Sequence, residues 1–113
     1  MPEKNKALVR RLVDEAINGG RLELVEDLFA PELAEPARQA FRSFRAAFPH
    51  RRKEIVDLVA EGDQVGGEVS LFRHLPGRVH GVAPNGRRKE VDEVFFLRVR
   101  EGRFVEYWRL ETT

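Results

Sequence analysis

The sequence contains no cysteine and no long apolar run, and each absence excludes a class of protein. Without cysteine there can be no disulfide bond, no thiolate metal site and no cysteine nucleophile. No apolar run approaches the roughly 18 residues that cross a membrane, and the charged start Met1-Pro2-Glu3-Lys4 is unlike a signal peptide. We therefore expect a cytoplasmic protein with no membrane partner.

An excess of charge of one sign is also missing. The chain has 20 basic and 19 acidic residues, a formal net charge of +1, so nothing global indicates a nucleic-acid partner. The short basic runs 51–53 and 87–89 are interpreted as solvated strand ends. The three histidines have no metal-ligand spacing, and no phosphate-binding glycine motif occurs. We predict neither a metal nor a nucleic-acid site.

The remaining composition is that of one globular domain spanning residues 1–113. Hydrophobic residues make up 42% and charged residues 35% of the chain, a balance typical of a folded protein. A chain of this length can enclose one core but is too short for two domains.

The first half has the periodicity of helices. Apolar residues recur every three or four positions between Leu8 and Ile17, before Gly19-Gly20, and again between Leu22 and Phe29. A third stripe is formed by Ala37, Ala40, Phe41, Phe44 and Phe48, and Pro49 should end that helix. Three helices are predicted before Pro49.

The second half has the alternation of strands. Strands are predicted over 53–61, 64–75, 87–100 and 104–111, with turns at 61–63, 76–77, 84–86 and 101–102. The pair Gly66-Gly67 suggests a bulge or bend in the second strand. Helices followed by a strand meander indicate an α+β fold, in which a bent sheet can curl around a helix and enclose a cavity.

Glu93 is the first candidate for chemistry. On the long strand it shares a face with Val91, Phe95, Leu97 and Val99, because side chains alternate along a strand. An apolar environment would raise the pKa of this carboxyl group and suit a general acid or base. The alternative is a carboxylate that is ion-paired or reaches solvent at a bend.

Tyr107 and Arg109 are the second candidates. If their face of the last strand is turned to the cavity, they could stabilise an enolate or other anionic oxygen. Alternatively, Arg109 pairs with Glu93 or Glu111 and Tyr107 packs in the core. The predicted ligand-binding residues are Phe95, Leu97, Phe44 and His74. His74 is expected near the cavity mouth, and the alternative is that it is a surface histidine.

Five segments together resemble the SnoaL-like polyketide cyclases of the nuclear-transport-factor-2-like superfamily. They are residues 5–20, Ala46-Ala47-Phe48-Pro49, Glu61-Gly62-Asp63-Gln64-Val65, residues 81–88 and residues 101–108. The resemblance implies a cone-shaped barrel of three helices and a curled antiparallel sheet, a pocket, often a homodimer, and proton-transfer chemistry without a cofactor. Where the cyclases read Glu-His-Trp-Asp, this chain has Glu106-Tyr107-Trp108-Arg109.

Two functions follow from these residues. The first is a cofactor-independent cyclase, isomerase or dehydratase that binds a small, mostly apolar carbonyl compound, with Glu93 carrying the proton and Tyr107 and Arg109 stabilising the oxyanion. The second is a ligand-binding or dimerisation module that has lost the family's acid/base. A homodimer is expected through the outer sheet face, predicted to carry Val94, Phe96, Phe104, Trp108 and Leu110. The alternative is that some of these residues pack beneath the helices.

Overall fold

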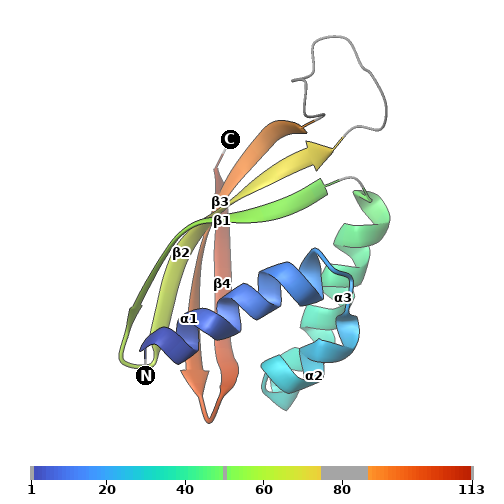
Figure 1. Ribbon diagram of the computed structural model, residues 1–113. Coiled ribbons are helices and arrows are strands. Elements are labelled where there is room, and N and C mark those ends of the chain that lie inside the picture. The colour runs from blue at the N-terminus through green and yellow to red at the C-terminus, as the bar shows by residue number, and fades with distance from the viewer. Residues whose placement is uncertain (1, 50, 75–86, 113) are drawn as a thin grey trace.

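Helices form the first half of the chain and antiparallel strands the second, in a computed structural model that describes residues 2–49, 51–74 and 87–112 (Figure 1). The side chains of residues 73, 74, 87–90 and 112 lie outside that description. The helices lie against one face of a strongly twisted sheet. The predicted α+β class is confirmed.

The three predicted helices are all present. The first is α1 (Pro2–Arg11), which continues as one turn of π-helix, η1 (Leu12–Ile17). The second consists of a 3-10 turn, η2 (Leu22–Leu24), and α2 (Val25–Leu28), and the third is α3 (Pro31–Ala47). Gly20 has a φ of +71°, a left-handed conformation that glycine adopts without strain, and it reverses the chain after η1.

The third helix begins earlier than its apolar stripe suggests. Pro31 occupies the first turn of α3, where a missing backbone N–H costs nothing and the fixed φ of proline suits the helix. A second proline, Pro36, lies inside the helix. The buried face begins at Ala34 and continues through Ala37 and Phe41. The helix ends at Ala47, before Pro49, as predicted.

The sheet contains four strands in the order β1-β2-β3-β4, and every neighbouring pair is antiparallel. The strands are β1 (Arg51–Glu61), β2 (Gln64–His74), β3 (Arg87–Arg100) and β4 (Arg103–Thr112). The helical layer is joined to β4 where the Ala30 N–H donates to the Phe104 carbonyl over 2.9 Å. At least four antiparallel strands between Arg52 and Glu111 were expected, and the described residues of this span form four.

A register shift in β4 corrects one sidedness prediction. Arg98 pairs with Glu106, but Val99 pairs with Phe104, so Val105 is an extra residue. An extra residue reverses the alternation of side chains. Phe104 is therefore 0% exposed and packs edge-on against Phe29 in the core. The expectation that Phe104 lies on the outer face is wrong, and the alternative, that some of the residues assigned to this face pack beneath the helices, holds for Phe104.

The bulge expected at Gly66-Gly67 lies across the ladder in β1. The β1–β2 register shifts between Ile55 and Asp57, next to these glycines. Gly67 serves another purpose: a Cβ there would lie 2.4 Å from the Asp57 carbonyl oxygen and 2.9 Å from Cζ of Phe95. Only glycine lets β1 and the Phe95 ring approach this closely.

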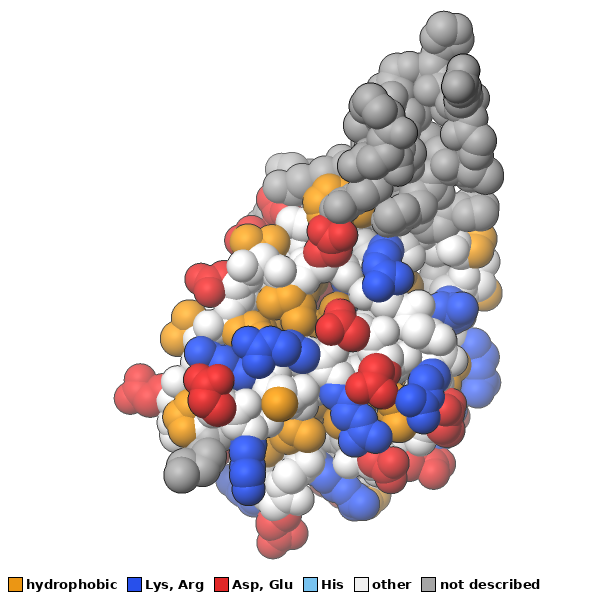
Figure 2. Space-filling model, viewed as in Figure 1, with side chains coloured by type: hydrophobic (Ala, Val, Ile, Leu, Met, Phe, Trp, Pro, Cys, Tyr) orange, Lys and Arg blue, Asp and Glu red, His pale blue; other side chains and the backbone are white. Residues whose placement is uncertain are grey.

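The core lies between the helices and the inner face of the sheet. It combines the stripe of α1 and η1 with alternate residues of the strands, including Val65, Val69 and Leu97. On the helical side of the surface, basic and acidic side chains are interspersed with small apolar areas (Figure 2). Among the described residues, that face shows no concentration of charge of one sign.

Candidate functional site

Glu93 is a carboxylate buried on the inner face of β3. It is 2% exposed and shares this face with Phe95, Leu97 and Val99, as the alternation predicted. Its two oxygens contact different cations: Oε1 lies 3.1 Å from Nζ of Lys53, and Oε2 lies 3.0 Å from Nη1 of Arg109. Glu93 is the shared partner of both cations, and without it the buried Lys53 ammonium would be left as an uncompensated charge in the core.

Lys53 is the site residue that the sequence reasoning missed. It stands on β1 opposite Leu71 and is 6% exposed, although the run 51–53 was interpreted as a solvated strand end. Burial lowers the pKa of Lys53, and the attraction of Glu93 opposes that effect. The usable signal was the two-residue spacing of Lys53 and Ile55, which places both on the face turned to the core.

Tyr107 and Arg109 of β4 lie beside Glu93, and Arg109 pairs with both Glu93 and Glu111, as the alternative prediction for Arg109 had it. Burial raises the pKa of Tyr107 to about 12, and the negative charge of Glu93 adds to this. Partial burial by itself would lower the pKa of Arg109. The hydrogen bond to Glu111 and the attraction of Glu93 outweigh that effect, so the pKa of Arg109 is raised. Nη1 of Arg109 lies 2.6 Å from Glu111 Oε1.

The four predicted ligand-binding residues have different positions. Phe95 and Leu97 are buried and line the same small cavity as Glu93. The Phe44 ring is half-buried on α3, with its centroid 5.3 Å from Nζ of Lys53. His74 ends β2, but its side chain lies outside the described residues, so its place at a cavity mouth remains a prediction.

The cavity at this cluster is small. It measures about 20 Å³ and is walled by Glu93, Lys53 and Tyr107 together with apolar residues of α1, η1 and the sheet: Val9, Leu12, Val13, Ile17, Val69, Phe95 and Leu97. A water molecule needs roughly 10–15 Å³, so the space suits one water or the oxygen end of a ligand. A larger ligand requires the surrounding groups to move.

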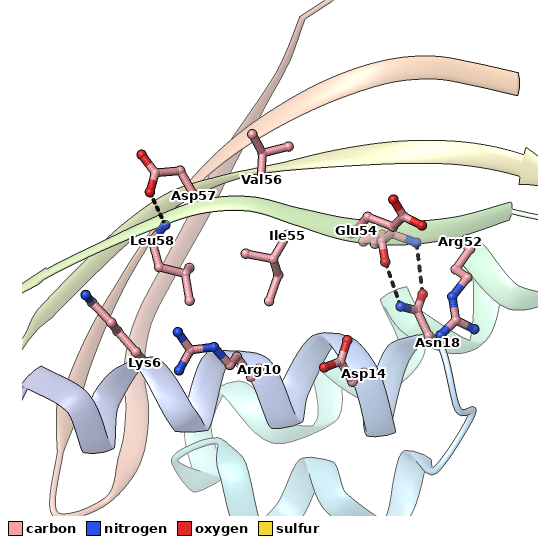
Figure 3. A pocket seen from close by; sticks show the side chains of 11 residues that line it. Lys6, Arg10, Asp14, Asn18, Arg52, Glu54, Ile55, Val56, Asp57 and Leu58 are labelled. Carbon is pink, nitrogen blue, oxygen red and sulfur yellow. Dashed lines mark hydrogen bonds between the residues drawn. The ribbon is translucent and has the colours of Figure 1, made fainter.

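A much larger open groove, of about 710 Å³, lies between the first helix and β1 (Figure 3). Ile55 and Leu58 point from the strand toward the helix, and Lys6 and Arg10 point from the helix toward the strand. Lys53 lines both the groove and the small cavity. The groove therefore adjoins the buried cluster without containing Glu93.

Asn18 fixes the backbone of Lys53. Its side-chain Nδ2 donates to the Lys53 carbonyl over 2.7 Å, and its Oδ1 accepts from the Lys53 N–H over 2.9 Å (Figure 3). The π-helical turn η1 precedes Asn18, whose own N–H reaches back to Val13 over 2.9 Å. The Asn18 amide thus bonds to both the N–H and the C=O of Lys53 on the outer edge of β1, as the backbone of a neighbouring strand would.

Neither a metal site nor a membrane span is found in the described part of the chain. Across residues 2–49, 51–74 and 87–112, no three histidine or acidic side chains lie together in a way that could hold a metal ion. No helix within these ranges is both long and apolar enough to cross a membrane.

Several solved structures share this architecture. IdmH from Streptomyces antibioticus has a TM-score of 0.77 at 23% identity, covering 95% of this chain and 91% of its own. AclR from Streptomyces galilaeus has a TM-score of 0.76 at 23% identity, covering 98% and 80%. A SnoaL-like polyketide cyclase from Agrobacterium tumefaciens has a TM-score of 0.77 at 13% identity, covering 96% and 91%.

These TM-scores establish that the chain shares the fold of these proteins, with three helices packed against a curled antiparallel sheet. No curated protein sequence matches the chain. The sequence model of the SnoaL-like polyketide cyclases, however, matches residues 7–112, nearly the whole chain. The chain therefore belongs to the SnoaL-like polyketide cyclase family.

Proposed function

We propose that the chain binds a small, mostly apolar carbonyl compound at the Glu93 cluster and moves a proton with Glu93, without a cofactor. The observation that carries this proposal is a 2% exposed carboxylate at the edge of a small cavity whose walls are mostly apolar. Buried, hydrogen-bonded acids are rare in cores and common where proton transfer occurs.

Arg109 occupies Oε2 of Glu93 and must turn away before this oxygen can take a proton from a ligand. Arg109 keeps 44% of its side chain exposed and already has a second partner in Glu111. Turning Arg109 outward toward Glu111 releases Oε2 of Glu93 and enlarges the space beside Tyr107. A ligand oxygen entering there would meet the Tyr107 hydroxyl, which stays protonated because its pKa is about 12.

Exchange of hydrogen for deuterium at the carbon next to a carbonyl tests this proposal. Acetone, cyclohexanone and 2,4-pentanedione are incubated with the protein in deuterated buffer and followed by proton NMR. We expect faster exchange of at least one compound with the wild-type protein, and loss of the acceleration in Glu93→Gln. The matched control is Glu106→Gln, which alters an exposed carboxylate on the outer face.

Two outcomes would count against this function. If Glu93→Gln exchanges as fast as the wild type while its urea midpoint shows a folded protein, Glu93 is not the proton carrier. If the wild-type protein accelerates exchange of none of the three compounds, the non-catalytic module becomes the better account.

We also propose that the chain forms a homodimer through the outer face of the sheet. Trp108 and Leu110 are 59% and 61% exposed, Val94 is exposed beside Leu110, and Phe96 stacks on Trp108 at 5.4 Å between ring centroids. Neighbouring apolar side chains on a single face favour an interface.

Sedimentation of the wild-type protein and of Trp108→Glu at micromolar concentration tests the dimer. We expect a dimer for the wild type and a monomer for the variant. Phe48→Glu is the control, because Phe48 is also an exposed aromatic residue but follows the end of α3. A monomeric wild-type protein would contradict the proposal.

A further inference from the structure

The amine of Lys53 is a buried group that the proposed proton transfer does not use. An ammonium group has three N–H donors. Among the described residues, the side chain of Lys53 makes one hydrogen bond, to Glu93 over 3.1 Å. The Phe44 ring, with its centroid 5.3 Å from Nζ, and the cavity that Lys53 lines are the surroundings of its other N–H groups.

The charged and titratable groups facing this amine come from two strands. Glu93 is on β3, and Tyr107, Arg109 and Glu111 are on β4. The first helix contributes only apolar side chains to the cavity wall. Burial lowers the pKa of Lys53, and Arg109 acts in the same direction, whereas Glu93 and Glu111 oppose the change. Burial and a neighbouring cation are the two devices that make a lysine a nucleophilic neutral amine.

We infer that Lys53 captures a small aldehyde or ketone as an iminium ion, a chemistry that rests on the proposed carbonyl-binding function of the same cavity. Glu93 is placed to exchange protons with the amine at 3.1 Å. The apolar wall limits water, which favours loss of water from the adduct. Asn18 holds both backbone polar groups of Lys53 and is the positioning residue.

The steps balance with these two side chains alone. The Lys53 ammonium gives a proton to the Glu93 carboxylate, and the resulting amine attacks the carbonyl carbon, forming a C–N bond as the C=O π bond breaks. Glu93 returns its proton to the oxygen, accepts one from the nitrogen, and passes it to the hydroxyl group, which leaves as water. An iminium ion and an ionised Glu93 remain, and the carboxylate can then take a proton from the carbon next to the iminium.

Reductive trapping on the wild-type protein tests this inference. Acetaldehyde, in amounts below one equivalent, is added at neutral pH with cyanoborohydride, which reduces an iminium ion to a stable ethyl-lysine. Peptide mass spectrometry then compares the rates at Lys53, Lys4 and Lys6, the last two lying on the surface helix α1. We expect Lys53 to be ethylated several-fold faster than Lys4 or Lys6.

Glu93→Gln should remove this preference, because it removes the proton carrier, without changing ethylation of Lys4 and Lys6. Glu106→Gln on the outer face should leave all rates unchanged. Ethylation of Lys53 that is no faster than that of Lys4 overturns the inference, as does a preference that survives Glu93→Gln in a folded protein.

Exchange at the ligand carbon separates the two proposals. If Lys53 is not trapped but Glu93-dependent exchange persists, the iminium is wrong and the proton-transfer function stands. If Lys53 is trapped preferentially while exchange does not depend on Glu93, the proposed proton transfer fails and the amine chemistry remains.

Discussion

On the inner face of the sheet, charged side chains are buried, whereas on the outer face apolar ones are exposed. Glu93 lies inside between Lys53 and Arg109, and its neighbour on the same strand, Val94, lies outside beside Leu110. The outer face also carries ion pairs, in which Arg98 contacts Asp63 and Glu106.

This difference separates charges that cost stability from charges that do not. Exposed ion pairs gain little and lose little, because water solvates both partners. A buried pair must offset the removal of two charges from water, and a well-packed apolar pair is often at least as stable. The inner cluster is therefore poorly explained by stability alone, which is the reason to place function there.

The largest effect is expected from breaking the inner cluster. Glu93→Leu leaves Lys53 and Arg109 without their shared partner, and we expect a loss of about 3–5 kcal/mol in the free energy of unfolding. The double variant Lys53→Met with Glu93→Leu should recover most of it, because both buried charges are then gone. Urea denaturation of Glu93→Leu and of the double variant measures how much of the lost free energy of unfolding is recovered.

Arg98→Leu is the matched control on the outer face, and its urea midpoint should move much less than that of Glu93→Leu. If Glu93→Leu and Arg98→Leu shift the midpoint equally, charges on the inner and outer faces contribute equally to stability, which would contradict the account. If the double variant is as unstable as Glu93→Leu, the buried pair itself stabilises the fold.

The next effect concerns the close approach of β1 and Phe95 over Gly67. Gly67→Ala forces a methyl group to within 2.4 Å of the Asp57 carbonyl, and overpacking of this kind should cost about 2–3 kcal/mol. Gly66→Ala is the neighbouring control, because its nearest atom would be 3.7 Å away. Equal urea midpoints for the two variants would contradict the account.

A smaller effect is expected from Asn18. Asn18→Ala removes two hydrogen bonds to the backbone of Lys53, and we expect a loss of about 1–2 kcal/mol. Asn5→Ala removes a single bond, over 3.2 Å to the Gly62 carbonyl, and serves as the control. Thermal unfolding should show a larger decrease in melting temperature for Asn18→Ala than for Asn5→Ala. The reverse order would show that the two bonds of Asn18 contribute less to stability than the single bond of Asn5.

The last effect is confined to alkaline pH. The chain has one tyrosine, so absorbance near the phenolate band reports Tyr107 alone. Its pKa of about 12 in the fold exceeds the value of about 10 in an unfolded chain. The stability that it contributes is complete below about pH 10 and is lost as pH rises toward about 12. A midpoint near 10 in the folded protein would show that Tyr107 is exposed.

The sequence predicted the inner cluster wherever alternation was unbroken. Along β3, counting in twos placed Glu93 with Phe95 and Leu97, and along β4 it placed Tyr107 with Arg109. The register of β3 with β4 then brought these groups together.

Alternation failed where the ladder contains an extra residue. Phe104 was assigned to the wrong face because Val105 is a bulge, and nothing in the sequence marks that position. Lys53 was missed for a different reason: the run Arg51-Arg52-Lys53 resembles a solvated end, and only the partner at Glu93 makes burial of its third member possible. The spacing of Lys53 and Ile55 indicates which face Lys53 occupies, but its partner Glu93 lies 40 residues away in the sequence, so the pairing itself cannot be predicted from local pattern.

The titration of Lys53 tests the central claim, that burial in the inner cluster lowers the pKa of its amine in spite of the neighbouring Glu93. With lysine labelled by carbon-13 at the ε position, NMR follows Lys53 through the pH range, and Lys53→Arg identifies its signal. We predict a pKa below the value of about 10.4 for an exposed lysine, because burial outweighs the attraction of Glu93. Glu93→Gln should lower it further. A Lys53 pKa at or above about 10.4 would show that the ion pair dominates and would contradict the account.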